Sequence, residues 1–344
     1  MSSINKLQFE SLLTQLIEQG AADLYLSAGN FPLMRVAGNL TPLNQEILTG
    51  NAIEELLLPL IAPEQINLLK ENKALIFSHS FANDLRFKIN LFYQKGSLAA
   101  DLHYIDNHLK SIGELDLSVN IEQIANINQG LVIVAGPFHS GKTTTVMAIL
   151  EQINQTKEFK IVTLEEPIEY FLTNAKSIVQ QREVGLDTPF LKEGLKDALK
   201  VNADVVFVAE TTEKEEFELV LELAEQGRLV ITVITAGSSL DVLIKIFSYF
   251  NIEEKLRFRE IFSRVLRVVV CQKLLLGLDK KMIVANEVLV NNDAVRLSIQ
   301  SEKLNQINNI LRTSLDSGMI SFEQTIDQLL KSGKISPEEA RKHT

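Results

Sequence analysis

The residues with the clearest chemical potential lie in the stretch GPFHSGKTTT, from Gly136 to Thr145. The spacing G-x-x-x-x-G-K-T is that of a phosphate-binding loop, and the apolar run LVIVA before it and the helix-forming run after it supply the strand and helix that such a loop needs. Glycines here let successive backbone N–H groups face an anion, and the helix N-terminus adds its positive dipole. We therefore expect a nucleotide to bind through Gly136, Ser140, Gly141, Lys142, Thr143 and Thr144.

Within this loop, two side chains have separate expected tasks. Lys142 is expected to reach the β- and γ-phosphates, and the hydroxyl of Thr143 to hold Mg²⁺. The predicted ligands are thus ATP and Mg²⁺. A loop alone binds nucleotide, whereas hydrolysis also needs a group that orients water near the γ-phosphate.

An acidic side chain follows another apolar run, VVFVAE, which places Glu210 at the carboxyl end of a buried strand. Ligands of parallel sheets bind at this edge. Glu210 is therefore the leading candidate for the catalytic carboxylate, and a candidate for holding Mg²⁺. The alternative is a surface glutamate at the start of the following helix, where acidic residues favour the positive end of the helix dipole.

A second acidic group lies in TLEEPIEY, where Glu165, Glu166 and Glu169 surround Pro167 directly after the strand-like run KIVTL. Carboxylates beside a Mg²⁺-nucleotide can position metal-bound water or act as a general base. Glu166 and Glu169 are therefore further catalytic candidates. The alternative is a proline-terminated strand whose acids are solvated.

Length, composition and charge restrict the class of protein. With 344 residues and 46% hydrophobic residues, the chain can bury a large core and favours two domains. The net charge of −10 argues against nucleic acid as the main partner, which usually needs a basic face. A single cysteine, Cys271, excludes an internal disulfide. The sequence shows neither a signal peptide nor an apolar run near the ~18 residues that a membrane span requires. We therefore expect a cytoplasmic protein.

Patterning along the chain predicts an α/β protein in four parts. Residues 1–108 read as an α/β domain, with a helix over 7–20, strands near 23–27, 32–38, 74–80, 85–94 and 97–105, and helices over 51–73. Residues 109–129 are polar and Asn-rich, as in a linker. Apolar runs alternate with amphipathic helices over 130–290, which indicates a largely parallel sheet, and a helical region follows over 291–344.

The ordered set of motifs carries a resemblance. The phosphate loop, TLEEPIEY, QQREVGLDT, VVFVAE and EQGRLV occur in one order at close spacing, and in this the chain resembles the type IV pilus retraction ATPases, the PilT-like branch of the type II/IV secretion ATPases. The resemblance covers nearly the whole chain. It includes AADLYLSAGNFPLMRVAGNL and LRFKINLFYQ in the first part, and NEVLVNNDAVRLSI and DSGMISFEQTIDQLLKSGKIS near the end.

The resemblance implies an N-terminal PAS-like domain, a RecA-like P-loop ATPase core and a helical C-terminal tail, assembled as a homo-hexamer. It also implies cytoplasmic ATP hydrolysis that drives pilus retraction and twitching motility through an inner-membrane platform protein. By position, Glu169 matches the last acid of the family's aspartate box and Glu210 its second Walker-motif glutamate. Arg86 and Lys88 match two family arginines, of which at least one is expected to reach nucleotide phosphate.

Departures from the family pattern concern catalysis more than binding. The family's histidine box GHLVFGTLHT reads GRLVITVITA, so Arg228 and Thr235 occupy the two histidine positions, and GEMRD reads AETTE, which keeps Glu210 but replaces the Arg and Asp. Charge-assisted contacts of this kind contribute on the order of several kcal/mol to a phosphoryl-transfer transition state. Their loss is therefore expected to slow turnover more than it weakens nucleotide binding.

Two functions from different classes remain open. The favoured one is a hexameric ATPase motor for pilus retraction, supported by the complete loop and Glu210. The other is a nucleotide-binding, catalytically impaired accessory subunit that assembles with an active paralogue, supported by the missing histidines. An unrelated P-loop protein is disfavoured by the extent of the resemblance.

Overall fold

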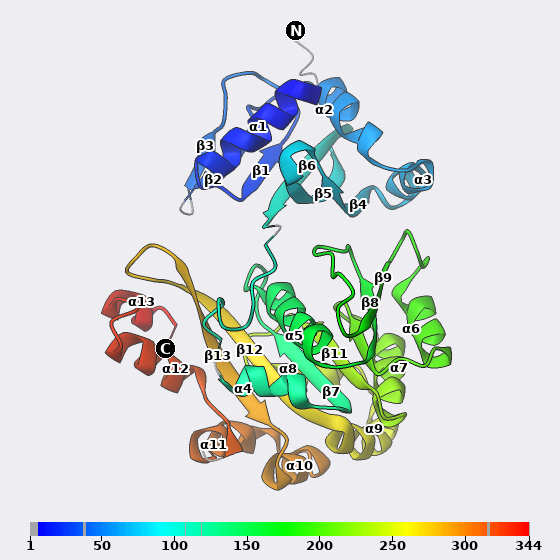
Figure 1. Ribbon diagram of the computed structural model, residues 1–344, viewed down its shortest axis with the longest axis vertical. Helices are drawn as coiled ribbons and strands as arrows, with labels where there is room; N and C mark the ends of the chain where they lie inside the picture. The colour runs from blue at the N-terminus through cyan, green and yellow to red at the C-terminus, as the bar shows by residue number, and fades with distance from the viewer. Residues whose placement is uncertain (1–5, 37–38, 107, 118, 315–316, 344) are drawn as a thin grey trace. The chain divides into compact units, whose positions relative to one another are not determined.

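The computed structural model describes residues 6–36, 39–106, 108–117, 119–314 and 317–343 (Figure 1). The chain forms two compact units. The first comprises Met1–His108, Glu166–Phe171 and Glu183–Asp187, and the second Leu109–Glu165, Leu172–Arg182 and Thr188–Thr344. Parts of two quoted motifs, at residues 37–38 and at residue 316, lie outside the described residues.

The first unit is built on a six-stranded sheet in the order β3-β2-β1-β6-β5-β4, with every neighbouring pair antiparallel. Its strands are β1 (Asp23–Leu26), β2 (Leu33–Val36), β3 (Asn39–Pro42), β4 (Ala74–Ser80), β5 (Arg86–Gln94) and β6 (Ser97–Ile105). Its helices are α1 (Lys6–Glu18), α2 (Gly50–Leu57) and α3 (Pro63–Asn72), with short 3₁₀ turns at Leu58–Leu60 and Ala82–Asp84. Every strand predicted here is present, whereas β3 was not predicted.

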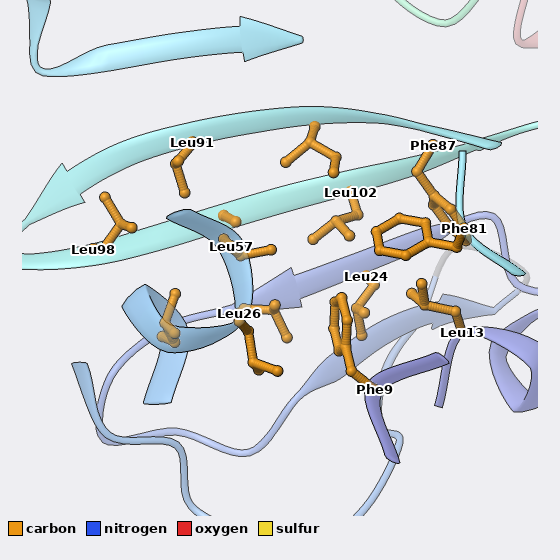
Figure 2. Packing of buried hydrophobic residues seen from close by; sticks show 14 of the residues in the cluster. Phe9, Leu13, Leu24, Leu26, Leu57, Phe81, Phe87, Leu91, Leu98 and Leu102 are labelled. Carbon is orange, nitrogen blue, oxygen red and sulfur yellow. The ribbon is translucent and has the colours of Figure 1, made fainter. Parts of the chain in front are cut away.

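Helical spacing explains the core of this unit. Phe9 and Leu13 lie four residues apart on α1, so both project from one face and are buried. Figure 2 shows them near Leu24 of β1 and the phenyl rings of Phe81 and Phe87. The ring centroids of Phe9 and Phe81 are 5.7 Å apart in an edge-to-face arrangement, a favourable geometry for aromatic pairs.

The second unit contains a seven-stranded sheet in the order β13-β12-β7-β11-β10-β8-β9. Its strands are β7 (Gly130–Ala135), β8 (Lys160–Glu165), β9 (Ile178–Glu183), β10 (Val205–Val208), β11 (Leu229–Ile234), β12 (Leu266–Leu276) and β13 (Met282–Val290). The run from β12 to β8 is parallel, and β13 pairs with β12 antiparallel. Every residue of β7, β10 and β11 is buried, as uninterrupted apolar runs predict.

Helices and 3₁₀ turns complete the second unit (Figure 1). They are α4 (Val119–Glu122), α5 (Lys142–Thr156), α6 (Leu191–Lys200), α7 (Lys214–Glu225), α8 (Ser239–Ser248), α9 (Ile252–Val265), α10 (Asp293–Gln300), α11 (Ile307–Thr313), α12 (Phe322–Lys331) and α13 (Pro337–Arg341), with 3₁₀ turns at Gln123–Asn126 and Leu304–Gln306. Because β7, β8, β10 and β11 are parallel, the residues that follow them share one edge of the sheet. This edge positions the candidate site.

Two smaller expectations concern membranes and cysteine. In the described part of the chain, no helix is both long enough and apolar enough to span a bilayer. Cys271 is fully buried in β12, and burial raises the pKa of its thiol well above the usual range. A neutral buried thiol is a poor nucleophile, so its role is packing.

Helix α7 allows a matched test of the core. Leu223 on α7 is fully buried, whereas Leu297 on α10 is 66% exposed. Leu223→Ala is expected to lower the free energy of unfolding by about 2 to 5 kcal/mol, because the lost contacts leave a cavity. Leu297→Ala should stay within about 0.5 kcal/mol of the parent. Urea unfolding followed by circular dichroism compares the two, and equal losses would contradict this packing.

Candidate nucleotide site

The phosphate loop joins the centre of the second sheet to the longest helix of that unit. Strand β7 ends at Ala135, and α5 begins at Lys142 after Gly141, whose φ of +81° lies in the left-handed region. Among the described residues, no side chain caps the start of α5, whereas side chains of Ser238, Asn251 and Asn292 cap α8, α9 and α10. The first N–H groups of a helix have no intrahelical partner, so this end of α5 suits an anion.

Gly136 leaves room that a side chain would fill. A Cβ at this position would lie 2.3 Å from Oγ of Ser140 and 2.5 Å from the backbone oxygen of Gln272. Ser140 is buried, and its Oγ has no hydrogen-bond partner among the described residues. An unpaired buried hydroxyl costs free energy, and a phosphate oxygen would satisfy it. The loop therefore fits a phosphate.

The charged and hydroxyl residues of the loop lie at its mouth. Nζ of Lys142 donates hydrogen bonds to the carbonyl oxygens of Gly136 at 2.9 Å and Pro137 at 2.8 Å. Thr143 and Thr144 are half-buried in the first turn of α5, where the Thr143 hydroxyl can serve as an oxygen ligand for Mg²⁺. The structure thus places all six predicted residues in the loop and the first turn of α5.

Gln272 supports the loop from the neighbouring strand and was missed by the sequence analysis. It follows Cys271, which pairs with Ala135 across β12 and β7. Its Nε2 donates to the carbonyl oxygen of Ser140 at 2.6 Å, and the residue is fully buried. A polar residue inside the apolar run RVVVCQKLLL was the available signal.

Glu210 lies just beyond β10, at the carboxyl edge of the sheet. Its Oε1 accepts a hydrogen bond from the amide of Thr235 at 2.8 Å, and its Oε2 accepts one from the Thr235 hydroxyl at 2.7 Å. Nζ of Lys245 lies 3.5 Å from Oε1. The N-cap of α7 is Glu213, so Glu210 does not cap that helix. The geometry places Glu210 on the edge that carries the phosphate loop.

The two substituted histidine positions lie at opposite ends of β11. Thr235 follows the strand and contacts Glu210, whereas Arg228 precedes it. Arg228 Nη2 donates to the carbonyl oxygens of Leu199 at 3.1 Å and Val201 at 3.0 Å, where α6 ends. At about 3.3 Å per residue, the two positions are roughly 20 Å apart. Only Thr235 therefore bears directly on Glu210.

The acidic residues of TLEEPIEY separate into different environments. Glu165 is buried. Its Oε1 accepts hydrogen bonds from Thr163 Oγ1 at 2.5 Å and from Gln181 Nε2 at 2.9 Å, so Glu165 links β8 to β9. Glu166 is exposed. Glu169 forms an ion pair with Lys88 at 2.9 Å. Glu166 and Glu169 belong to the first unit and Glu210 to the second, so catalytic roles for the first two stay predictions.

Arg86 is engaged within the first unit. It is 7% exposed, and it donates from Nη2 to the carbonyl oxygen of Ile168 at 2.7 Å and from Nε to that of Glu169 at 2.9 Å. Its guanidinium lies 4.3 Å from the ring centroid of Phe171. Glu183 accepts from the amide of Ile168 at 3.0 Å, and burial raises the pKa of that carboxyl. Arg86 thus holds the acidic segment, and its contact with nucleotide stays a prediction.

Gly136 provides a test of the loop. Gly136→Ala places a methyl group against backbone, so the loop must shift, and overpacking of this kind costs about 1 to 3 kcal/mol of stability. ATP affinity is expected to fall at least about tenfold, equivalent to about 1.4 kcal/mol. Gly113 has open space around its Cβ position, so Gly113→Ala is the matched control. Titration with fluorescent ATP measures both, and unchanged affinity in Gly136→Ala would contradict the close approach.

Comparison with known proteins agrees with this geometry. Residues 106–327 match the family described as type II/IV secretion system protein. The type IV pilus retraction ATPase PilT of Pseudomonas aeruginosa is 32% identical over 330 residues, 96% of either chain. The type IV pilus ATPase PilU of that organism is 29% identical over 340 residues, 98% of this chain and 88% of that protein.

A solved structure extends the comparison to the fold. The crystal structure of the pilus retraction motor PilT with bound ADP matches with a TM-score of 0.84 at 32% identity, over 97% of this chain and 96% of that one. The predicted α/β fold class, with an N-terminal domain before a P-loop core, is confirmed. The chain is a member of the type II/IV secretion ATPase family, in its PilT-like branch of type IV pilus ATPases.

Proposed function

We propose that the chain is an ATP-hydrolysing motor of a type IV pilus system that drives pilus retraction. The observation that carries this proposal is the position of Glu210. It lies at the carboxyl edge of the sheet, held by Thr235 at the end of the strand next to β7. A complete phosphate loop leaves β7 at the same edge, and phosphoryl transfer to water needs both parts.

Each residue then has a defined task. Lys142 exchanges the carbonyl oxygens of Gly136 and Pro137 for phosphate oxygens of ATP, and the uncapped N-terminus of α5 adds backbone donors. Glu210 orients the attacking water. Mg²⁺, when bound, neutralises phosphate charge, and Thr143 would hold it with Glu210 alongside.

The wider assembly is also part of the proposal. We infer a homo-hexamer in the cytoplasm that works on an inner-membrane pilus platform, with Glu166, Glu169 and Arg86 acting in the same cycle. The proposed domains are residues 1–108, 109–129, 130–290 and 291–344. Support comes from the similarity to a protein named as a pilus retraction motor over nearly the whole chain.

A second candidate function is a nucleotide-binding accessory subunit with little turnover. It is favoured by Thr235, whose hydroxyl donates to Glu210. The family resemblance predicts histidine at this position. Pseudomonas aeruginosa also carries both PilT and PilU among the relatives of this chain. A chain of this type can therefore coexist with a second pilus ATPase, with which it would form a hetero-assembly.

Steady-state phosphate release separates the two candidates. The purified full-length chain is mixed with Mg²⁺-ATP while light scattering reports its oligomeric state. Release from the chain alone, together with a six-subunit mass, supports the motor. Binding without release, with release only after an active paralogue is added, supports the accessory subunit.

A further inference from the structure

Glu210 sits in a closed ring of contacts that involves a residue no motif singles out. Nζ of Lys245, a residue of α8, lies 3.5 Å from Oε1 of Glu210. The same Nζ donates to the carbonyl oxygen of Thr235 at 3.2 Å, and Thr235 donates to both carboxylate oxygens of Glu210. Three segments of the chain, the ends of β10 and β11 and the middle of α8, are tied together at this carboxylate.

The contacts leave the two carboxylate oxygens unequal. An ionised carboxylate offers about two acceptor positions on each oxygen. Oε1 of Glu210 receives two donors, the Thr235 amide and Lys245, whereas Oε2 receives one, the Thr235 hydroxyl, among the described residues. Oε2 is therefore the oxygen with an acceptor position left for a water molecule.

Helix α8 holds Lys245 firmly in place. Its residues Val242, Leu243 and Ile246 are fully buried. The side chain of Ser238 caps its N-terminus, and the amide of Ser239 donates to Oε1 of Glu287 at 2.7 Å. Beyond its last turn, the hydroxyl of Tyr249 donates to the carbonyl oxygen of Thr211, the residue after Glu210. The helix is thus held at both ends, at its start by Glu287 of β13 and at its end by a direct contact with the Glu210 segment.

The contact between Lys245 and Glu210 differs from an ordinary surface ion pair. Exposed pairs contribute little, since water competes for both partners. The Lys245 and Glu210 side chains are 35% and 27% exposed, and Lys245 bridges two acceptors that the backbone of β11 brings together. Such a bridge restricts rotation of the carboxylate, which is what a group that must aim water requires.

We propose that Lys245, with Thr235, is a positioning residue of Glu210 that directs Oε2 toward the attacking water. This inference rests on the proposed function, since it assigns how the carboxylate of that site is held. Lys245 acts through Glu210 and is not assigned a contact with nucleotide or water.

Turnover of the full-length chain with Mg²⁺-ATP gives the first test. Lys245→Met is expected to lower kcat on the order of 10- to 100-fold, because a misplaced group loses alignment, and to leave KM within about threefold. Lys245→Arg should restore most of the rate, and Lys245→Met should cause no further loss in a Glu210→Gln background. Lys255 pairs with Glu302 at 3.4 Å on α9, so Lys255→Met is the matched control.

A second measurement does not depend on turnover. Hydrogen exchange of the Thr235 amide is expected to accelerate at least about tenfold in Glu210→Ala and in Lys245→Met, whereas the Val230 amide in β11 stays unchanged. An inactive parent chain with this exchange pattern would overturn the proposed function and leave the positioning contact standing. Full kcat in Lys245→Met, or unchanged Thr235 exchange in both variants, would overturn the inference.

Discussion

Glu210→Gln lowers ATP hydrolysis on the order of 10²- to 10³-fold and leaves nucleotide affinity within about threefold of the parent chain. Gln keeps an oxygen that can accept the Thr235 amide, so the edge of the sheet stays folded. It lacks the negative charge that pairs with Lys245 and that draws a proton from water. Catalysis therefore falls and binding does not.

Phosphate release at saturating Mg²⁺-ATP and a titration with fluorescent ADP measure the two effects separately. Glu222→Gln is the matched control, because Glu222 is an exposed acid on α7. The control should hydrolyse at the parent rate. Hydrolysis in Glu210→Gln equal to that of the control would remove Glu210 from the mechanism.

Lys142→Ala abolishes nucleotide binding over the range where the parent chain saturates. Charge-assisted hydrogen bonds contribute about 1.5 to 3 kcal/mol each, so loss of contacts to two phosphates raises Kd at least about 100-fold. The fold is expected to persist, since Nζ of Lys142 donates to the carbonyl oxygens of Gly136 and Pro137 at the loop mouth and not to the buried core. Isothermal titration with ADP and with ATP measures the change.

An exposed lysine on another helix controls for loss of charge. Lys196 on α6 forms a surface pair with Glu193 at 3.5 Å, so Lys196→Ala should bind ADP as the parent does. A parent-like Kd in Lys142→Ala would show that nucleotide binds elsewhere. Glu210→Gln and Lys142→Ala together separate catalysis from binding, because Glu210→Gln is expected to retain the nucleotide binding that Lys142→Ala loses.

Local sequence was enough to predict the loop and the strands that carry it. The run LVIVA, the glycines at 136 and 141 and the following helix are all specified by neighbours in the chain. The same holds for Glu210, whose place depends on the end of one apolar run. Strand β3 was missed because its residues are mostly exposed and polar, without the alternation that marks a half-buried strand.

Contacts between neighbouring strands that are distant in the sequence could not be predicted from local sequence. Gln272 meets Ser140 only because β12 lies beside β7, and Thr235 meets Glu210 only because β11 lies beside β10. Lys245 reaches both through the packing of a helix. Each is a tertiary contact between segments that strand order brings together, and one sequence carries no direct record of strand order.

The contacts of Arg86 also could not be predicted from local sequence. The family resemblance predicts that Arg86 or Lys88 reaches nucleotide, which stays a prediction, and the structure adds hydrogen bonds from the Arg86 guanidinium to the backbone carbonyl oxygens of Ile168 and Glu169. A side chain with five donors can serve many acceptors. The choice among them depends on which segment folds against β5.

A single-turnover measurement separates hydrolysis of bound ATP from its binding. The chain is held in excess over radiolabelled ATP with Mg²⁺, so that bound ATP is followed through the chemical step without repeated binding. We predict that the parent chain converts its bound ATP to ADP and phosphate, while Glu210→Gln binds the same share and leaves it intact. Bound ATP that stays intact in the parent chain would contradict a motor of this kind, because a complete loop and Glu210 would then hold nucleotide without hydrolysing it.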